Sequence, residues 1–308
     1  MREVGVSTRS EGKLKAWSAW VGLKEGLWGR VYGGALVSDC YLGEPLATGR
    51  TAEIYAWDER VVLKLFHAWF SPDDVEYEHK ISSAVHSSGL RSPEVGEIIE
   101  IDGRLGLLYE RLEGISLLDA LRARPWTILR YSKGMAELHA EIHATPAPVG
   151  LPRLKEKLER RIRMVTGIRD EVRDALLSAL QDLPEGDHLC HGDFHPGNIL
   201  LTRDGLVAID WIDAAEGAPM ADLARSSVLV MGELAIPGLT TSFERLVLGC
   251  GQRAYRRRYG QLHPAGNEEH DAWLPIIAAA RLSEGIEELT PWLREQAERV
   301  LLKHGAAL

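Results

Sequence analysis

Three polar side chains with the chemistry of a phosphoryl-transfer site lie between residues 193 and 210. Asp193 and Asn198 belong to the stretch HGDFHPGN (residues 191–198), and Asp210 belongs to IDW (residues 209–211). A carboxylate can orient an attacking hydroxyl and accept its proton, while an amide oxygen and a second carboxylate can hold Mg²⁺. These residue types therefore indicate phosphoryl transfer from a nucleotide.

A predicted β-hairpin would bring the three side chains together. The apolar runs 199–201 and 206–209 flank the turn TRDG, which is typical of a hairpin. Asp193 and Asn198 then lie on the loop before the hairpin, and Asp210 lies just beyond its second strand. An isolated Asp in a loop is usually a turn former or a helix cap. The prediction therefore depends on all three residues converging on one pocket.

The spacing of these motifs resembles the aminoglycoside phosphotransferase and choline kinase-like family, small-molecule kinases with the protein-kinase fold. Protein kinases carry Arg at the position of Gly192 and Phe-Gly after the metal-binding Asp, so both departures favour the small-molecule branch. The resemblance covers residues 45–290, most of the chain. The roles that it implies are catalytic for Asp193, metal-binding for Asn198 and Asp210, and structural support of the site for His191 and Asp222.

An upstream strand, predicted over residues 61–66 (VVLKLF), carries a lysine inside an apolar run. Such a lysine needs a partner if it is buried, or it can point to solvent from an edge strand. The resemblance implies that Lys64 holds the α- and β-phosphates of ATP and pairs with a Glu of the helix predicted over 71–88. Glu78 and Glu76 are both candidates, and the usual spacing of the family favours Glu78.

The nucleotide-binding segments follow from the same resemblance. One glycine lies in the turn between the predicted strands 45–47 and 54–57, where protein kinases have three. The phosphate-loop candidates are Gly49, Arg50 and Thr51, and the adenine contacts are the backbone of Glu110 and Leu112 in the hinge between the lobes.

The fold class that the resemblance implies is α+β, with two lobes as in protein kinases. A small antiparallel sheet forms the N-lobe over residues 45–112, and a mainly helical C-lobe over 113–308 holds the catalytic loop and the acceptor site. Residues 1–44 form an N-terminal extension to which no role is assigned. Helices are predicted over 129–143, 153–181, 221–232, 242–258, 271–284 and 291–304, with a further one starting at 116.

Two further patterns have an ordinary structural interpretation. His139 and His143 stand four residues apart, which is also a zinc-ligand spacing, but no Glu follows His139 and no further ligands are found. We therefore expect packed or partly exposed histidines. The Lys and Arg residues of 153–181 alternate with Glu, which favours a solvated helix face over a nucleic-acid patch.

Composition limits the partners. The 308-residue chain has a formal net charge of −9, which argues against binding to nucleic acid or to an anionic membrane. No apolar run approaches the roughly 20 residues that span a bilayer, and no secretory signal is recognised. Three widely spaced cysteines form no disulfide or zinc pattern, which predicts a reducing cytoplasm. The acceptor could be cationic, met by acidic residues near the C-terminus such as Glu284 or by the ring of Trp273.

Two alternatives to a small-molecule kinase remain. A nucleotide-binding pseudokinase or scaffold is disfavoured because Lys64, Asp193, Asn198 and Asp210 are all present. A kinase acting on protein side chains is disfavoured because the segment after Asp210 is short and lacks the Ala-Pro-Glu end of an activation loop. The choice between ATP and another nucleoside triphosphate, the identity of the hydroxyl acceptor and the oligomeric state do not follow from the sequence.

Overall fold

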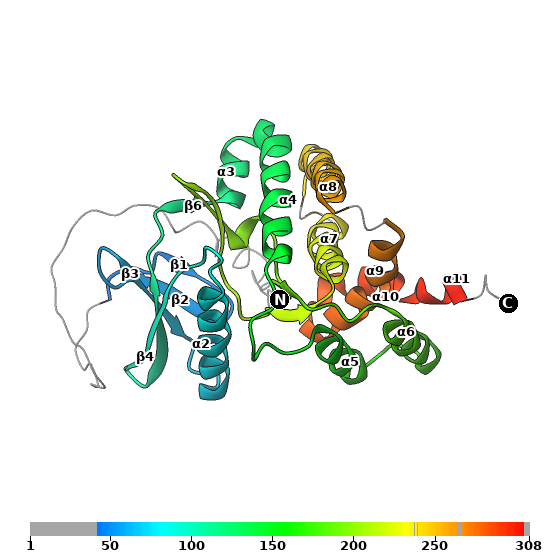
Figure 1. Ribbon diagram of the computed structural model, residues 1–308, viewed down its shortest axis with the longest axis horizontal. Helices are drawn as coiled ribbons and strands as arrows, with labels where there is room; N and C mark the ends of the chain where they lie inside the picture. The colour runs from blue at the N-terminus through cyan, green and yellow to red at the C-terminus, as the bar shows by residue number, and fades with distance from the viewer. Residues whose placement is uncertain (1–41, 237, 239, 264–266, 305–308) are drawn as a thin grey trace, which may run out of the picture.

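The structure, a computed structural model, describes residues 42–236, 238, 240–263 and 267–304. These residues form an N-terminal lobe built on a sheet and a larger helical lobe (Figure 1). The architecture confirms the predicted α+β class. Apart from residues 42–44, the N-terminal extension lies outside the described residues.

A five-stranded antiparallel sheet forms the N-lobe, in blue and cyan in Figure 1. Its order is β1-β2-β3-β5-β4. The strands are β1 (Ala47–Thr48), β2 (Ala52–Ala56), β3 (Val61–Phe66), β4 (Val95–Ile101) and β5 (Arg104–Glu110). Because β3 is central and pairs with both β2 and β5, Lys64 does not lie on an edge strand.

Helix α2 (Pro72–Ser87) packs on the sheet of the N-lobe. The hydroxyl of Ser71 accepts from the Asp74 N–H and caps its first turn, where proline is also favourable. Val75 is fully buried and packs with Phe66 of β3. This contact fixes the rotation of α2. Glu78, the acidic residue on the buried face of the helix, therefore points toward β3.

The C-lobe is a helical layer around a continuous apolar core. Helix α4 packs against α8, and α7 packs against α9 (Figure 1). None of the helices in the described ranges combines the length and apolar character needed to span a bilayer. The helices are α3 (Leu117–Ala123), α4 (Ile128–Ala144), α5 (Leu154–Met164), α6 (Asp170–Asp182), α7 (Pro219–Ala235), α8 (Ser242–Leu262), α9 (Asn267–Arg281), α10 (Thr290–Glu298) and α11 (Val300–His304).

Two small sheets hold the motif-bearing loop. β7 (His188–Cys190) pairs with β10 (Ala215–Gly217), and β6 (Gly114–Ser116) pairs with β8 (Ile199–Thr202). β8 also pairs with β9 (Gly205–Ala208) in the predicted hairpin, with Thr202 opposite Gly205. The loop between β7 and β8, residues 191–198, is therefore anchored by a strand at each end.

The helix predictions needed three adjustments. The region 153–181 is two helices, α5 and α6, because the chain turns at residues 165–169, where Gly167 has a φ of +77°. The prediction over 271–284 merges α9 with a 3₁₀ turn, Leu282–Glu284, that begins after Arg281. The last predicted helix is likewise two, α10 and α11.

Candidate active site

Asp193 and Asn198 are in direct contact at the two ends of the loop between β7 and β8. The Asn198 amide donates to Asp193 Oδ2 at 3.0 Å and to the Asp193 carbonyl at 2.9 Å. The Asn198 carbonyl in turn accepts from the Ile209 N–H at 2.9 Å. These bonds draw the loop before the hairpin and the segment after it to the same point, as the sequence predicted.

His191 also connects the loop before the hairpin to the segment after it. Its Nδ1 accepts from the Asp193 N–H at 3.2 Å, so Nε2 carries the proton and donates to the Ile209 carbonyl, also at 3.2 Å. The ring is fully buried and lies 4.4 Å from that of Trp211. His191 therefore holds the backbone on both sides of the site while its ring stays away from solvent.

Lys64 connects the N-lobe to the third motif residue. Its Nζ lies 2.6 Å from Glu78 Oε1 and 3.3 Å from Asp210 Oδ1. Glu78 is 1% exposed and also accepts from the Tyr109 hydroxyl at 2.8 Å, whereas Glu76 is exposed. Of the two candidate glutamates, Glu78 is therefore the one that forms an ion pair with Lys64.

Attraction between opposite charges stabilises the contacts of Lys64 with Asp210 and Glu78. Burial lowers the pKa of Lys64, but the carboxylates of Asp210 and Glu78 outweigh it, so that the pKa is raised and the ammonium is retained. Burial likewise raises the pKa of Glu78, against the opposing effect of Lys64. Glu78 Oε2 is buried and has no hydrogen-bond partner among the described residues. The pair is thus costly in isolation, which favours a functional role over a purely structural one.

Asp210 and Asn198 have the donor set of a magnesium site. Asp210 adopts a φ of +64°, which is uncommon outside glycine, and its side chain is 38% exposed. Because the Asn198 nitrogen is bound to Asp193, the amide oxygen is the group left to bind a metal. Carboxylate and amide oxygens are the ligands that Mg²⁺ accepts, so the residues fit the ion.

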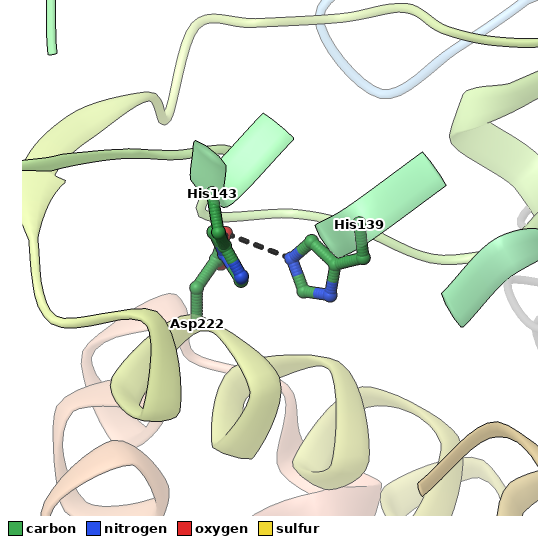
Figure 2. Close-up of side chains that lie close together, drawn as sticks. All are labelled: His139, His143 and Asp222. Atoms are coloured by element: carbon green, nitrogen blue, oxygen red, sulfur yellow. Dashed lines mark hydrogen bonds and ion pairs between the residues drawn. The ribbon is translucent and has the colours of Figure 1, made fainter. Parts of the chain in front are cut away.

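Asp222, near the start of α7, holds the beginning of the motif loop. Its Oδ2 accepts from the His191 N–H at 2.6 Å, and its Oδ1 accepts from the Gly192 N–H at 2.9 Å. His139 and His143 of α4 point at the same carboxylate, at 3.1 and 3.2 Å from Oδ2 (Figure 2). Four donors therefore converge on one carboxylate that is 1% exposed.

The two histidines are neutral and fully used as hydrogen-bonding groups. Burial, then the nearby His143, lowers the pKa of His139 to about 3. Each Nε2 donates to Asp222, so each Nδ1 accepts from a tyrosine of α8, His139 from Tyr255 and His143 from Tyr259. Although these ligand atoms lie within 4.8 Å of one another, a metal would have to displace this whole network. The histidines pack, as expected.

Glycine is required at position 192 for a steric reason. Its φ is +79°, and a Cβ placed there would collide with the backbone carbonyl of Asp213. The backbone at residue 192 and the backbone of Asp213 approach so closely that only glycine fits. Residue 192 must therefore be glycine because the backbone of Asp213 packs so closely on the loop.

A comparison with protein families places this geometry in context. A family model described as the phosphotransferase enzyme family (APH) matches residues 43–260, which include every residue of the site named so far. The chain belongs to this family. The resemblance inferred from the motifs is thereby confirmed.

Solved structures with the same fold are related to this phosphotransferase at low identity. A thermostable mutant of aminoglycoside phosphotransferase APH(4)-Ia, in its apo form, has a TM-score of 0.60 at 20% identity, over 86% of this chain and 95% of that one. Amicoumacin kinase hAmiN has a TM-score of 0.56 at 16% identity, over 83% and 87% of the two chains. An aminoglycoside-3'-phosphotransferase of type VIII has a TM-score of 0.53 at 20% identity, over 80% and 91%. No curated protein sequence matches.

The nucleotide-binding candidates of the phosphotransferase lie on two turns. Gly49, Arg50 and Thr51 form the turn between β1 and β2, where Gly49 N–H donates to the Ala52 carbonyl at 2.7 Å and Arg50 is exposed. At the hinge, the Glu110 N–H already donates to the Glu94 carbonyl at 2.8 Å. For adenine, this leaves the Glu110 carbonyl and the Leu112 N–H, which donates to no described residue.

A charged group that the sequence did not predict lies on the other side of Asp193. Arg225 donates from Nε to the Gly192 carbonyl at 3.1 Å, and its Nη2 lies 3.5 Å from Asp193 Oδ1 and 2.7 Å from Glu284 Oε1. The available signal was the spacing of Arg225 three residues after Asp222, which puts both on one face of a helix.

The predicted solvated face of 153–181 is wrong for two lysines. Lys155 and Lys157 are each 7% exposed. Lys157 donates to the Asp213 carbonyl at 2.9 Å and to its Oδ1 at 3.2 Å, and Lys155 donates to the Leu183 carbonyl at 2.8 Å. Both ammonium groups are buried because α5 packs against the loop and against the end of α6, contacts that alternation of charge along the helix does not reveal.

The surroundings of Asp193 keep its carboxylate ionised. Burial alone would raise the pKa of Asp193, but a hydrogen bond and the charge of His195, followed by Arg225 and His191, hold the pKa well below its usual range. An acid this strong is a weak base in the ground state. It can orient a hydroxyl throughout and accept the proton only when the oxygen has begun to bond to phosphorus.

Proposed function

We propose that this protein transfers the γ-phosphate of ATP, or of another nucleoside triphosphate, to a hydroxyl group of a small molecule in a Mg²⁺-dependent reaction. The observation that carries the proposal is the pair of contacts made by Lys64 with Glu78 at 2.6 Å and with Asp210 at 3.3 Å. They connect the sheet of the N-lobe to the segment beside Asp193 and Asn198. A phosphotransferase needs this connection to align a nucleotide with its acceptor.

In the proposed reaction, the acceptor oxygen forms a bond to the γ-phosphorus as the bond to the β,γ-bridging oxygen breaks, and ADP leaves. Asp193 orients the hydroxyl and takes its proton. Lys64 binds the α- and β-phosphates and is held in place by Glu78. Asn198 and Asp210 would hold Mg²⁺, which when bound neutralises phosphate charge. Positioning and electrostatics therefore account for most of the rate.

Known structures with this fold support the use of a nucleotide. A ternary complex of the APH(4)-Ia mutant contains ADP and hygromycin B, and the amicoumacin kinase complex contains AMP-PNP, Ca²⁺ and Ami. We infer a nucleotide in the equivalent position here, against the turn of Gly49, Arg50 and Thr51 and against the Glu110 carbonyl and Leu112 N–H.

The segment after Asp210 supports a small acceptor. Between Asp210 and the start of α7 at Pro219 the chain is short, and part of it is β10, which is paired with β7. It therefore forms no extended activation loop on which a peptide could dock. Among the described residues Cys190 and Cys250 are free thiols, and we propose a cytoplasmic location.

ADP release in the presence of Mg²⁺, measured with a panel of hydroxyl compounds, tests the proposal. We expect at least one compound to stimulate release above basal hydrolysis and to become phosphorylated. Asp210→Asn should raise the Mg²⁺ concentration needed for half-maximal rate about tenfold or more. Nucleotide binding without release for any compound would indicate the pseudokinase alternative, and phosphorylation of a protein such as casein alone would indicate a protein kinase.

A further inference from the structure

The wall beside Asp193 carries four cations and, apart from Asp193 itself, two carboxylates. Lys157 and Arg161 of α5 share one carboxylate, Asp213, at 3.2 and 2.7 Å. On the adjoining helices, Arg225 and Arg281 share a second, Glu284, at 2.7 and 3.5 Å. Each acidic side chain of the wall is thus already engaged by two cations. The surplus is local, because the chain as a whole has a formal net charge of −9.

Arg281, the last residue of α9, is the cation of this group whose hydrogen-bonding capacity is least used. It is 7% exposed, and its Nε and Nη1 atoms are buried with no hydrogen-bond partner among the described residues. Its contact with Glu284, from Nε to Oε2 at 3.5 Å, is an ion pair without a hydrogen bond. Arg225, by contrast, donates to the Gly192 carbonyl at 3.1 Å. A guanidinium has five N–H groups, and leaving them unbonded in the interior costs stability.

Arg281 is connected to the catalytic loop through two intervening side chains, Glu284 and Arg225. Arg281 contacts Glu284, Glu284 contacts Arg225, and Arg225 lies 3.5 Å from Asp193 Oδ1. Burial, then the charge of Arg225, lowers the pKa of Arg281, while Glu284 and Asp193 attract the guanidinium. The unbonded donors therefore lie within the electrostatic reach of Asp193.

The same wall is unsuited to the cationic acceptor suggested by the sequence. Glu284 is occupied by two arginines, and Trp273 is fully buried, so neither can meet a bound ammonium group. Asp271 is paired with Arg256 at 3.4 Å. A cation approaching Asp193 would in addition be repelled by Arg225 and Arg281.

Resting on the proposed function, we propose that the acceptor carries an oxyanion, a carboxylate or a phosphate, on the same molecule as its reactive hydroxyl, and that Arg281 binds this group. Arginine suits the role because its planar fork donates two parallel hydrogen bonds to either oxyanion. The bound anion would satisfy the buried donors and balance the surplus positive charge. Arg161, whose side chain is 30% exposed, borders the same wall and adds to the attraction.

Titration calorimetry on the full-length protein, loaded with ADP and Mg²⁺, tests this inference without requiring turnover. The probes are malate as a hydroxy carboxylate, glycerol 3-phosphate as a hydroxy phosphate, glycerol as the uncharged reference and kanamycin as the polycation. We expect one or both anions to bind at least about tenfold more tightly than glycerol and kanamycin. The tighter of the two anions identifies the oxyanion as carboxylate or phosphate.

Arg281→Gln should weaken anion binding about tenfold or more and leave ADP affinity unchanged. The matched control is Arg253→Gln, which removes an exposed arginine of α8 and should change neither. Because the guanidinium makes no hydrogen bonds to described residues, Arg281→Met should not lower Tm, whereas a structural arginine would. Equal anion affinity in wild type and Arg281→Gln, tightest binding of kanamycin, or binding of neither anion would overturn the inference.

The proposal and the proposed function can fail separately. An anion that depends on Arg281 for binding but never stimulates ADP release with any acceptor would count against the kinase and leave the oxyanion site intact. Phosphorylation of a cationic or uncharged acceptor, insensitive to Arg281→Gln, would support the kinase and refute the oxyanion site.

Discussion

Lys64 Nζ and Glu78 Oε1 are 2.6 Å apart, and they join the central strand of the N-lobe to α2 at a position where Glu78 is 1% exposed. The Tyr109 hydroxyl donates to the same oxygen at 2.8 Å. The orientation of the Lys64 ammonium group therefore depends on one buried carboxylate and on the packing of α2.

Glu78→Gln should lower kcat/KM for ATP by about 100-fold, because it removes the charge that holds Lys64 and leaves the ammonium facing only Asp210. Steady-state kinetics with varied ATP measure the effect. Glu76→Gln, on the exposed face of the same helix, is the control and should behave as wild type. Equal losses in the two variants would show that the ion pair does not position Lys64.

Asp222→Asn should destabilise the fold by about 3 kcal/mol, because four donors lose a charged acceptor and the amide nitrogen would face N–H groups. Urea unfolding followed by circular dichroism gives the free energy of unfolding. Asp174→Asn, on the exposed face of α6, should change it by less than about 0.5 kcal/mol. A difference between the two variants of under about 1 kcal/mol would argue against the network as described.

Stability should fall on acidification from pH 7 to pH 5. The pKa of His139 is about 3 in the folded chain, so between that value and the unfolded value of about 6.5 only the unfolded chain binds the proton. The stabilisation is therefore present above pH 6.5 or so and is lost as pH falls, at up to about 1.4 kcal/mol per pH unit. Lowered pKa values of His143 and His191, both dominated by burial, act in the same direction.

Tm measured across this pH range in wild type and in His139→Gln checks the assignment. The variant should be less stable at pH 7 but should lose less on acidification, while His79→Gln, at a partly exposed position of α2, should keep the wild-type dependence. Asp193 and Asp222, two carboxylates whose pKa values are lowered, titrate below this range and do not contribute to it. An unchanged slope in His139→Gln would show that another group is responsible.

Gly192→Ala should cost about 3 kcal/mol of stability and most of the activity, because a φ of +79° and the Asp213 carbonyl leave no room for a Cβ. Thermal unfolding and ADP release measure the two effects. Gly205→Ala is a useful comparison: its φ is also positive, at +126°, but its Cβ would meet no atom within 4 Å. If Gly192→Ala were no worse than Gly205→Ala, backbone strain alone would explain the requirement for glycine.

Local spacing was sufficient to predict how the core of the site is arranged. Asp193 and Asn198 flank a loop that a short hairpin follows, so their meeting with the segment of Asp210 depends on contacts close in sequence. The Lys64 strand and the capped helix were predicted from local patterns, whereas the pairing of Lys64 with Glu78 rather than Glu76 followed from the family resemblance.

Long-range packing explains what the sequence did not predict. Arg225 lies on α7, whereas Arg281 ends α9 and Glu284 lies in the 3₁₀ turn that follows, so the three side chains meet beside the catalytic loop only when α7 and α9 pack together. Lys157 appeared solvated because its own helix alternates in charge, whereas its burial is imposed by Asp213, 56 residues away. Residues 1–41, to which the sequence assigned no role, lie outside the described residues.

Transfer of labelled γ-phosphate by Asp193→Asn, with ADP affinity measured on the same preparation, tests the central claim most directly. We predict that transfer falls by about 100- to 10,000-fold, because the hydroxyl loses the carboxylate that orients it and takes its proton, while ADP affinity stays within about threefold of wild type. Transfer near the wild-type rate, with ADP still bound, would contradict the assignment of Asp193 and with it the proposed reaction.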